Sequence, residues 1–221
     1  YEMRRGIYCE RIFHLAHINF HFMSLYTRRG DKGETDLLKG VRTDKDSLRI
    51  GVIGTLDELC SLLGLVRTKC QLTNVSEAII YLQKTLFEMG ALLAGHEGAT
   101  IPPAKTLEDV IDELEKLLPP MRHFILPGGH EGAALLHHAR SVCRRAERLV
   151  VALQKKETVD ENVLIFLNRM SDLLFALARY VNHTYMLQDQ VWEGVPNEKS
   201  KKEKATQEVE IQEMEFAEKT A

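Results

Sequence analysis

The chain has 221 residues, of which 44% are apolar, and its formal net charge is -3. This length is most simply one domain that buries its core without disulfides or a structural metal, and the charge excludes the overall basic field of a non-specific nucleic-acid binder. Because no apolar run reaches the roughly 18 residues of a membrane span, we expect a soluble protein. The cysteines form no C-x-x-C pair and are expected to be reduced and buried. They are Cys9, Cys60, Cys70 and Cys143.

Residues 1–22 differ in composition from the rest of the chain, and the domain is expected to start near Met23. They combine three arginines with three histidines: Arg4, Arg5, Arg11, His14, His17 and His21. A basic targeting peptide would explain the arginines, but Glu2, Glu10 and the scarcity of serine argue against it. We therefore expect a flexible N-terminal extension. The histidine spacing could hold a metal, although no metal site is expected there.

Helical patterns follow a Gly- and Asp-rich loop that covers residues 30–46. The first helix is predicted to start near Thr55, because Thr55-Leu-Asp-Glu58 has the form of a capping box. The second ends near Gly95, and apolar residues recur along it every three or four positions. These residues are Ile79, Leu82, Leu86, Met89 and Leu93. The third starts near Thr106 and must stop at Pro119-Pro120, since proline cannot continue a helix.

Two longer helical patterns complete the predicted domain. The fourth helix begins after Gly128-Gly129, and the fifth runs from about Glu161 to beyond Val181 with Asn168 on a partly buried stripe. Five amphipathic helices without a convincing alternating segment predict an all-α, five-helix up-and-down bundle over residues 23–195. Residues 196–221 are rich in Lys and Glu, so we expect a flexible charged tail.

The fourth helix carries a stripe of arginines. Arg140, Arg144 and Arg148 are spaced by four residues, so they are neighbours on one face, where like charges destabilise an isolated helix by roughly 0.2–0.5 kcal/mol per pair. Such a stripe suits an anionic ligand. The alternative is a solvated face in which Glu147 neutralises Arg144 and Arg148 through local pairs.

A second candidate anion site lies in the loop Gly30-Asp31-Lys32-Gly33. Glycines on both sides of Asp31-Lys32 permit a tight turn with converging backbone N–H groups, and Lys32 and Arg28 add positive charge. The alternative is an ordinary surface turn, since the spacing is not that of a P-loop. Asn168 could likewise be a packing amide between helices, and Asp57 a group that complements the helix dipole.

Five separated motifs follow one another along residues 26–186. They are Tyr26-Thr-Arg-Arg-Gly-Asp-Lys-Gly33, Gly54-Thr-Leu-Asp-Glu-Leu59, Phe124-Ile-Leu-Pro-Gly-Gly129, Ala139-Arg-Ser-Val-Cys-Arg-Arg-Ala-Glu-Arg148 and Phe166-Leu-Asn-Arg-Met-Ser-Asp172. No single motif is decisive, but the ordered set resembles the PduO-type ATP:cob(I)alamin adenosyltransferases, which make adenosylcobalamin. The resemblance implies a ferritin-like bundle that assembles as a homotrimer and binds ATP and corrinoid at its subunit interfaces.

The resemblance also implies residue roles. The family's nucleotide contacts match Thr27, Arg28, Gly30, Asp31, Lys32, Gly33, Thr35, Lys45, Arg144, Glu147, Arg148 and Asn168. In the family, an aspartate like Asp57 pairs across the interface with an arginine like Arg140, and Phe124 matches the aromatic residue below the corrin ring. We therefore expect catalysis to depend on Arg140, Arg144, Asp57 and Phe124.

The implied reaction transfers the 5′-deoxyadenosyl group of ATP to cobalt and releases triphosphate. Because cob(I)alamin is itself the nucleophile, the protein needs no Ser or Cys nucleophile, only positioning and stabilisation of the leaving triphosphate. Mg²⁺ is expected to be coordinated mainly by the ATP phosphates, with no side chain assigned to it. The chain lacks the D-x-H-x-x-G signature that donates a histidine to cobalt, which agrees with the four-coordinate cobalt that the family forms.

Several positions depart from the family pattern. Arg28 replaces a common lysine, Glu34 a small or uncharged residue, Cys60 a typical asparagine and Ile53 a frequent aromatic. Because a carboxylate beside a triphosphate is unfavourable, Glu34 is not assigned to the site.

Two other classes fit parts of the sequence. A non-catalytic corrinoid or nucleotide carrier would share the fold without needing both the loop and the arginines. A di-iron carboxylate bundle would require Glu-x-x-His pairs, which are absent, and His137-His138 is expected at the surface or an interface.

We expect a cytoplasmic protein, with the mitochondrial matrix as the alternative, because members of the family occur in both. Neither nucleic acid nor a membrane is an expected partner. An adenosylcobalamin-dependent enzyme could accept the product.

Overall fold

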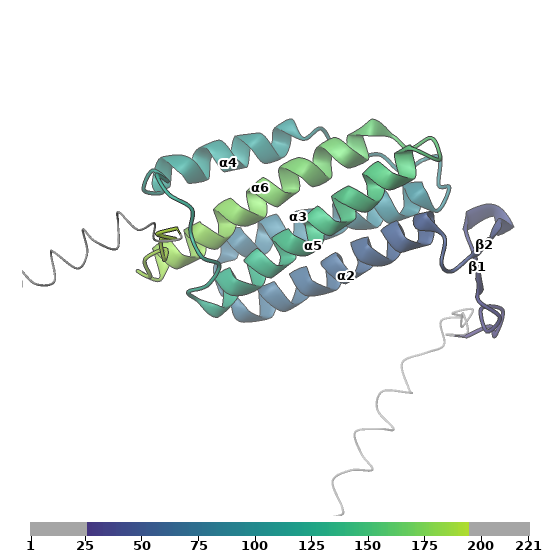
Figure 1. Ribbon diagram of the computed structural model, residues 1–221, viewed down its shortest axis with the longest axis horizontal. Coiled ribbons are helices and arrows are strands. Elements are labelled where there is room, and N and C mark those ends of the chain that lie inside the picture. Colours follow the sequence, from purple (N-terminus) through teal and green to yellow (C-terminus); the bar gives the residue numbers. More distant parts are fainter. Residues whose placement is uncertain (1–25, 195–221) are drawn as a thin grey trace, which may run out of the picture.

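The computed structural model describes residues 26–194, so the expected leader, the charged tail and Cys9 lie outside the described part. Five α-helices dominate it: α2 (Leu48–Lys69), α3 (Thr73–Leu93), α4 (Lys105–Leu117), α5 (Glu131–Gln154) and α6 (Glu161–Thr184). They run close to the long axis of the molecule, as Figure 1 shows. The predicted five-helix up-and-down bundle is therefore confirmed.

The core lies among the four longer helices, while α4 covers one side. Helix α5 packs against both α6 and α2, α3 packs mainly against α2, and α4 lies on α6. The largest side chains with no significant exposure come from all five helices: Leu56, Leu63, Ile79, Met89, Leu107, Leu136, Phe166 and Met170. Burial of this apolar surface stabilises the bundle at roughly 25 cal/mol per Å².

The first helix starts earlier than the sequence pattern predicted. It begins at Leu48, and the side chain of Ser47 caps it by accepting a hydrogen bond from the Ile50 N–H. Thr55 lies inside the helix, where its hydroxyl donates to the Gly51 carbonyl at 2.8 Å. The Thr-x-x-Glu pattern was misleading because Val52 is fully buried and anchors the upstream turn to the core despite two neighbouring glycines. Tertiary packing thus overrides the local capping signal.

The other helices begin and end close to the predicted residues. Helix α3 ends before Gly95, whose φ of 98° is a left-handed conformation that favours glycine. Helix α4 starts one residue before Thr106 and stops before the two prolines. The three described cysteines are free and buried, as expected, and burial raises the pKa of the Cys143 thiol far above its ordinary value. Within residues 26–194, no helix is both long and apolar enough to span a membrane.

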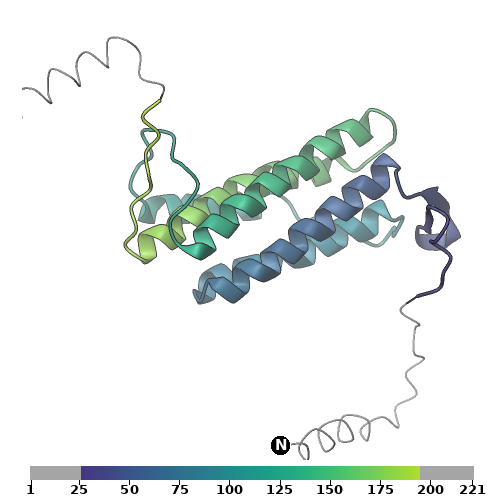
Figure 2. The same ribbon diagram turned by 60° about the horizontal axis from the view of Figure 1, so that its bottom comes forward.

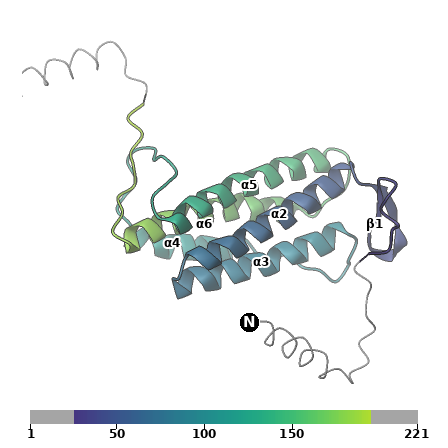
Figure 3. The same ribbon diagram turned by 90° about the horizontal axis from the view of Figure 1, so that it is seen from below.

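A small β-hairpin, which the sequence did not predict, projects from one end of the bundle (Figure 3). Strands β1 (Glu34–Asp36) and β2 (Arg42–Asp44) pair in antiparallel register, with Thr35 opposite Thr43. Three-residue strands are too short to show an alternating pattern. The Leu38 N–H donates to the Ala94 carbonyl at 2.9 Å and so ties the hairpin, through its short η1 turn (Leu38–Gly40), to the end of α3.

Candidate functional site

The turn at residues 30–33 lies just before the hairpin and is closed by Lys45. The Gly33 φ of 87° requires glycine, and the Lys45 N–H donates to the Gly33 carbonyl at 2.8 Å. The Lys45 ammonium lies so close to Gly30 that a Cβ there would come within 3.0 Å of Nζ. The structure therefore brings the predicted loop and Lys45 together, with the cation held over the turn.

The predicted ligands of this loop face solvent. Thr27, Arg28, Asp31, Lys32 and Gly33 are exposed, whereas Gly30 and Thr35 are partly buried. Arg28 adopts a left-handed φ of 58°, and its guanidinium lies 5.6 Å from the centre of the Tyr26 ring.

The carboxylate of Glu34, which was not assigned to the site, has a partner on the neighbouring strand. It accepts a hydrogen bond from Arg42 Nη2 at 2.8 Å. Arg42 also contacts Asp36, at 3.3 Å, which links both ends of β1 to β2. The negative charge of Glu34 is thus balanced inside the hairpin.

Asp57 lines a groove that begins at the same hairpin. The groove has a volume of about 800 Å³, and β1, α2 and α3 form its walls. Thr35, Lys45 and Asp57 contribute polar groups, while Ile53, Cys60 and Phe87 supply apolar surface. We call the turn at residues 30–33 together with Thr35, Lys45 and Asp57 the loop half-site.

The arginine stripe on α5 leaves two cations without a partner. Glu147 does not pair with Arg144 or Arg148; its Oε1 accepts a hydrogen bond from Asn168 Nδ2 at 2.9 Å. Within residues 26–194, neither arginine forms a hydrogen bond or an ion pair, and both are exposed. This arrangement favours anion binding over the alternative of a locally neutralised face. We call Arg140, Arg144, Arg148, Glu147 and Asn168 the arginine half-site.

Asn168 differs in one respect from the sequence prediction. It is exposed and not partly buried, because α6 turns this stripe away from the core. Its bond to Glu147 links α6 to α5, so the packing role and the ligand role proposed for it are compatible. Arg145, the neighbour of Arg144, points elsewhere and pairs with Glu58 of α2.

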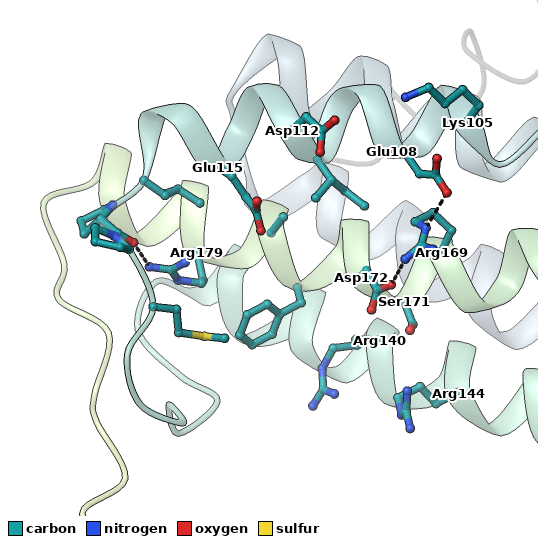
Figure 4. Close-up of a pocket in the computed structure, with 17 residues that line it drawn as sticks. Lys105, Glu108, Asp112, Glu115, Arg140, Arg144, Arg169, Ser171, Asp172 and Arg179 are labelled. Carbon is teal, nitrogen blue, oxygen red and sulfur yellow. Dashed lines mark hydrogen bonds and ion pairs between the residues drawn. The ribbon is translucent and has the colours of Figure 1, made fainter.

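A groove of about 960 Å³ lies between α4 and the pair α5 and α6 (Figure 4). Arg140 and Arg144 line one side of it, and acidic residues of α4 line the other. Arg169 is already bound to Glu108 at 3.2 Å and to Asp172 at 2.7 Å. The unpaired positive charge of the groove therefore comes from α5.

Phe175 lines this groove beside Arg140, and His137 packs against Phe175. Only 3% of His137 is exposed, which contradicts its expected place at the surface or an interface, while His138 is exposed. The Phe175 ring packs edge-on to His137 at 5.6 Å and lies 6.0 Å from the Arg140 guanidinium. Burial, and then the charge of Arg140, lower the pKa of His137. Helical spacing explains the error, since His137 follows Ala133 by four residues on the same buried face.

Phe124 belongs to the connection between α4 and α5. Figure 2 shows this connection, together with the segment that follows α6, at the end of the bundle opposite the hairpin. The Phe124 side chain is 75% exposed, and its ring centre lies 6.3 Å from that of Trp192. The two aromatic residues border a groove of about 500 Å³. The sequence reading overlooked Trp192, although an aromatic residue in a polar segment after the last helix is a detectable signal.

Within one chain, the loop half-site and the arginine half-site remain separate. The two grooves share no lining residue, and no hydrogen bond or ion pair among the described residues joins the two half-sites. Asp57 and Arg140, which the family resemblance pairs across an interface, lie in different grooves. Each half-site has polar groups that are exposed to solvent.

The described side chains offer no ready-made metal cage. Among residues 26–194, no three His, Cys, Asp or Glu side chains converge as metal ligands would. Mg²⁺ prefers six oxygen ligands and commonly takes several of them from phosphates and water.

Comparison with known proteins shows the family to which the chain belongs. The family model described as cobalamin adenosyltransferase matches residues 25–181. A corrinoid adenosyltransferase of Bacillus subtilis (strain 168) is 45% identical over 169 residues, which cover 72% of this chain and 87% of that protein. The corrinoid adenosyltransferase MMAB of Homo sapiens is 41% identical over 171 residues, covering 71% of this chain and 68% of that protein.

A solved structure shares the whole fold. It is a variant of the PduO-type ATP:corrinoid adenosyltransferase from Lactobacillus reuteri in complex with cobalamin and ATP. Its TM-score is 0.74 at 34% identity, covering 76% of this chain and 99% of that one. The chain described here therefore belongs to the cobalamin adenosyltransferase family.

Proposed function

We propose that this protein transfers the 5′-deoxyadenosyl group of ATP to the cobalt of cob(I)alamin, giving adenosylcobalamin and triphosphate. The observation that carries the proposal is the exposed pair Arg144 and Arg148, two cations on one helix face that no described carboxylate neutralises. The Lys45-covered turn at residues 30–33 adds a second cationic surface. The named activity of relatives that are 45% and 42% identical supports the choice of reaction.

In the proposed step, the electron pair of Co(I) forms a bond to C5′ of ATP while the bond between C5′ and the triphosphate oxygen breaks. The leaving oxygen keeps the bonding pair, so negative charge grows on the triphosphate. Arg144, Arg148, Lys32 and Lys45 stabilise that charge, and the arrangement of both substrates in line supplies the rest of the catalysis. No proton moves in this step, which explains why no general base is required.

The remaining nucleotide contacts surround the same phosphates. Thr27, Arg28, Gly30, Asp31, Gly33 and Thr35 contribute from the loop half-site, and Glu147 and Asn168 orient the arginine half-site through their mutual hydrogen bond. Mg²⁺ supplies charge neutralisation when it enters with ATP, and Asp31 is the exposed carboxylate of the turn that could face it.

The functional unit is a homotrimer in which the loop half-site of one copy faces the arginine half-site of the next. The separation of the two half-sites in a single chain supports this assembly, since one copy alone does not bring the two cationic surfaces together. Asp57 of one copy pairs with Arg140 of its neighbour.

Phe124 provides the apolar wall of the corrinoid site. A side chain that is 75% exposed has a large apolar surface available for the corrin ring. Its packing against the lower face displaces the axial base, leaving four-coordinate cobalt that accepts an electron more readily.

For location we propose the cytoplasm, with the mitochondrial matrix as the alternative, because the curated relatives come from bacteria and from mammals. Residues 23–195 form the catalytic domain, and an adenosylcobalamin-dependent enzyme accepts the product.

The proposed function is tested by anaerobic incubation of the protein with ATP, Mg²⁺ and chemically reduced cob(I)alamin. The absorption spectrum should change to that of adenosylcobalamin at a rate proportional to protein concentration. No change, with ATP still bound, would favour a non-catalytic carrier of corrinoid or nucleotide.

A further inference from the structure

Phe124 belongs to no helix, so its position must be fixed by contacts from other segments. The turn that contains it joins α4 to α5, and its exposed ring has only Trp192 as an aromatic neighbour among the described residues. A wall that excludes an axial base must hold its place against the corrin. The backbone contacts of residues 118–130 therefore decide where the Phe124 ring lies.

The segment after α6, residues 185–194, lies along one side of this turn. The Trp192 N–H donates to the Phe124 carbonyl at 2.8 Å, and the Leu126 N–H donates to the Gln190 carbonyl at 2.8 Å. Ile125 and Val191 form an antiparallel bridge between these two bonds. The Phe124 backbone is thus held by the 185–194 segment.

Asn182, near the end of α6, fixes the other side of the turn. It is 3% exposed, and its Oδ1 accepts from the His130 N–H at 2.9 Å while its Nδ2 donates to the Gly128 carbonyl at 3.0 Å. The Gly129 φ of 95° bends the backbone around this amide, and a Cβ at Gly129 would lie 2.3 Å from Oδ1. A buried amide with both ends bonded holds the backbone in one conformation.

Asp189 lies in the 185–194 segment and connects it to Arg179 and Asn182 of α6. Its Oδ2 accepts from Arg179 Nε at 2.8 Å, and its Oδ1 lies 3.4 Å from Asn182 Nδ2. The side chains of this ion pair are only 11% and 19% exposed, so water screens it little. Arg179 also donates to the Pro119 carbonyl at 2.8 Å, at the start of the turn. The cluster of Arg179, Asn182 and Asp189 thus contacts the turn at Pro119 and Gly128. Through Asp189 it also holds the segment that bonds to Phe124.

We infer that Asp189 and Asn182 are positioning residues that place Phe124 for the corrinoid. This inference rests on the proposed function, because it assumes that Phe124 meets the corrin ring. Neither residue needs to touch a substrate. Loss of the cluster would release the 185–194 segment and allow the Phe124 ring to move, which should impair the displacement of the axial base before it impairs the transfer itself.

The test compares Asp189→Ala with wild type and Phe124→Ala in two reactions. One starts from pre-reduced cob(I)alamin, and the other from cob(II)alamin with an added one-electron reductant. Asp189→Ala should slow the cob(II)alamin reaction about tenfold more than the cob(I)alamin reaction, equal to about 1.4 kcal/mol, and should leave the KM for ATP unchanged. Asp189→Asn keeps an acceptor for Arg179 and should recover part of the loss.

Trp192 gives a second readout, since it is the only tryptophan of the chain. Cob(II)alamin held against Phe124 should quench its fluorescence in wild type and quench it less in Asp189→Ala. The control Glu157→Ala removes another partly exposed ion pair, with Arg49, between α2 and the α5–α6 connection. It should leave the ratio of the cob(I)alamin rate to the cob(II)alamin rate, and the quenching of Trp192, as in wild type.

A second pair of variants covers the case in which Asp189→Ala does not fold. Gly129→Ala forces Asn182 to move and should reproduce the selective loss, whereas Gly128→Ala meets no atom within 4 Å and should not. The positioning role would be overturned if a folded Asp189→Ala protein lost the same factor in both reactions. It would also be overturned if its ratio of cob(I)alamin to cob(II)alamin rates stayed within about twofold of wild type. If wild type itself forms no adenosylcobalamin, the proposed function fails and this inference fails with it.

Discussion

Asp57 and Arg140 carry opposite charges in two grooves that share no lining residue, with Asp57 beside the hairpin and Arg140 beneath α4. Neither forms an ion pair among the described residues. Arg140 Nε, moreover, is buried without a hydrogen-bond partner in the described part of the chain. Buried donors without partners are costly, and this supports the proposed pairing of Arg140 with Asp57 of a second copy.

Exchange of these two charges tests their pairing across the interface. Asp57→Arg and Arg140→Asp should each convert trimer to monomer or abolish turnover, while the double variant should recover assembly, with a coupling energy between about 0.5 and 3 kcal/mol. Sedimentation velocity measures the assembly state. The control exchange of Glu113 and Lys116, an exposed pair within α4, should leave the trimer intact. Single variants that remain fully active trimers would contradict the pairing.

Removal of Arg144 tests the triphosphate site. Arg144→Ala should lower the rate of adenosyl transfer by about 100-fold or more, as expected for the loss of a group that stabilises developing charge. The circular dichroism signal should not change, because the side chain is exposed and unpaired within the described residues. Arg67→Ala removes an exposed arginine whose side chain, among residues 26–194, bonds only to Ser76 and Gln83, and it should keep near-normal turnover. Normal turnover in Arg144→Ala would exclude the assigned role.

Truncation of Phe124 tests the corrinoid wall. Phe124→Ala should slow adenosylation from cob(II)alamin more than from pre-reduced cob(I)alamin, since only the former needs the axial base to be displaced. Stopped-flow absorbance under anaerobic conditions gives both rates. Ile165→Ala removes an exposed apolar side chain from the far end of α6 and should affect neither. Equal losses in Phe124→Ala would indicate a general disturbance of the fold.

His137 should make stability depend on pH. Burial, and then Arg140, lower its pKa below the ordinary 6.5, with Asp189 acting in the opposite direction. The unfolded chain therefore binds more protons than the folded one below pH 6.5, so the free energy of unfolding should fall as the pH drops below that value, by at most about 1.4 kcal/mol per pH unit for one proton.

Urea denaturation between pH 5 and 8 measures this dependence. His137→Leu should flatten the acid limb of the stability curve, because it removes the buried titrating group. His138→Leu alters the exposed neighbour and should leave the limb as it is. An unchanged limb in His137→Leu would show that other groups control the acid response.

Most of the helices could be predicted because each has an apolar face of helical period that the bundle buries. The start of α2 could not, since the burial of Val52, which packs the first turns of the helix against the core, is invisible in a local capping pattern. The hairpin was missed because its strands have three residues each and are fixed by a contact between Leu38 and Ala94, far apart in the sequence.

The candidate site was predictable where it rests on residue type and spacing. Arg144 and Arg148 of α5 are exposed, while Arg140, four residues earlier, is partly buried. Neither Arg144 nor Arg148 pairs with Glu147, because Asn168, 21 residues away, bonds to it instead. The cluster of Arg179, Asn182 and Asp189 was not recognised, because its partners at residues 119–130 meet it only in the folded chain. Long-range contacts of polar side chains are what the sequence does not display.

The most direct test of the central claim is the stoichiometry of products in a single anaerobic turnover of ATP and cob(I)alamin. Chromatography should find one intact triphosphate for each adenosylcobalamin formed, because the bond that breaks is between C5′ and the triphosphate oxygen. Release of diphosphate or free phosphate without adenosylcobalamin would contradict adenosyl transfer by this protein.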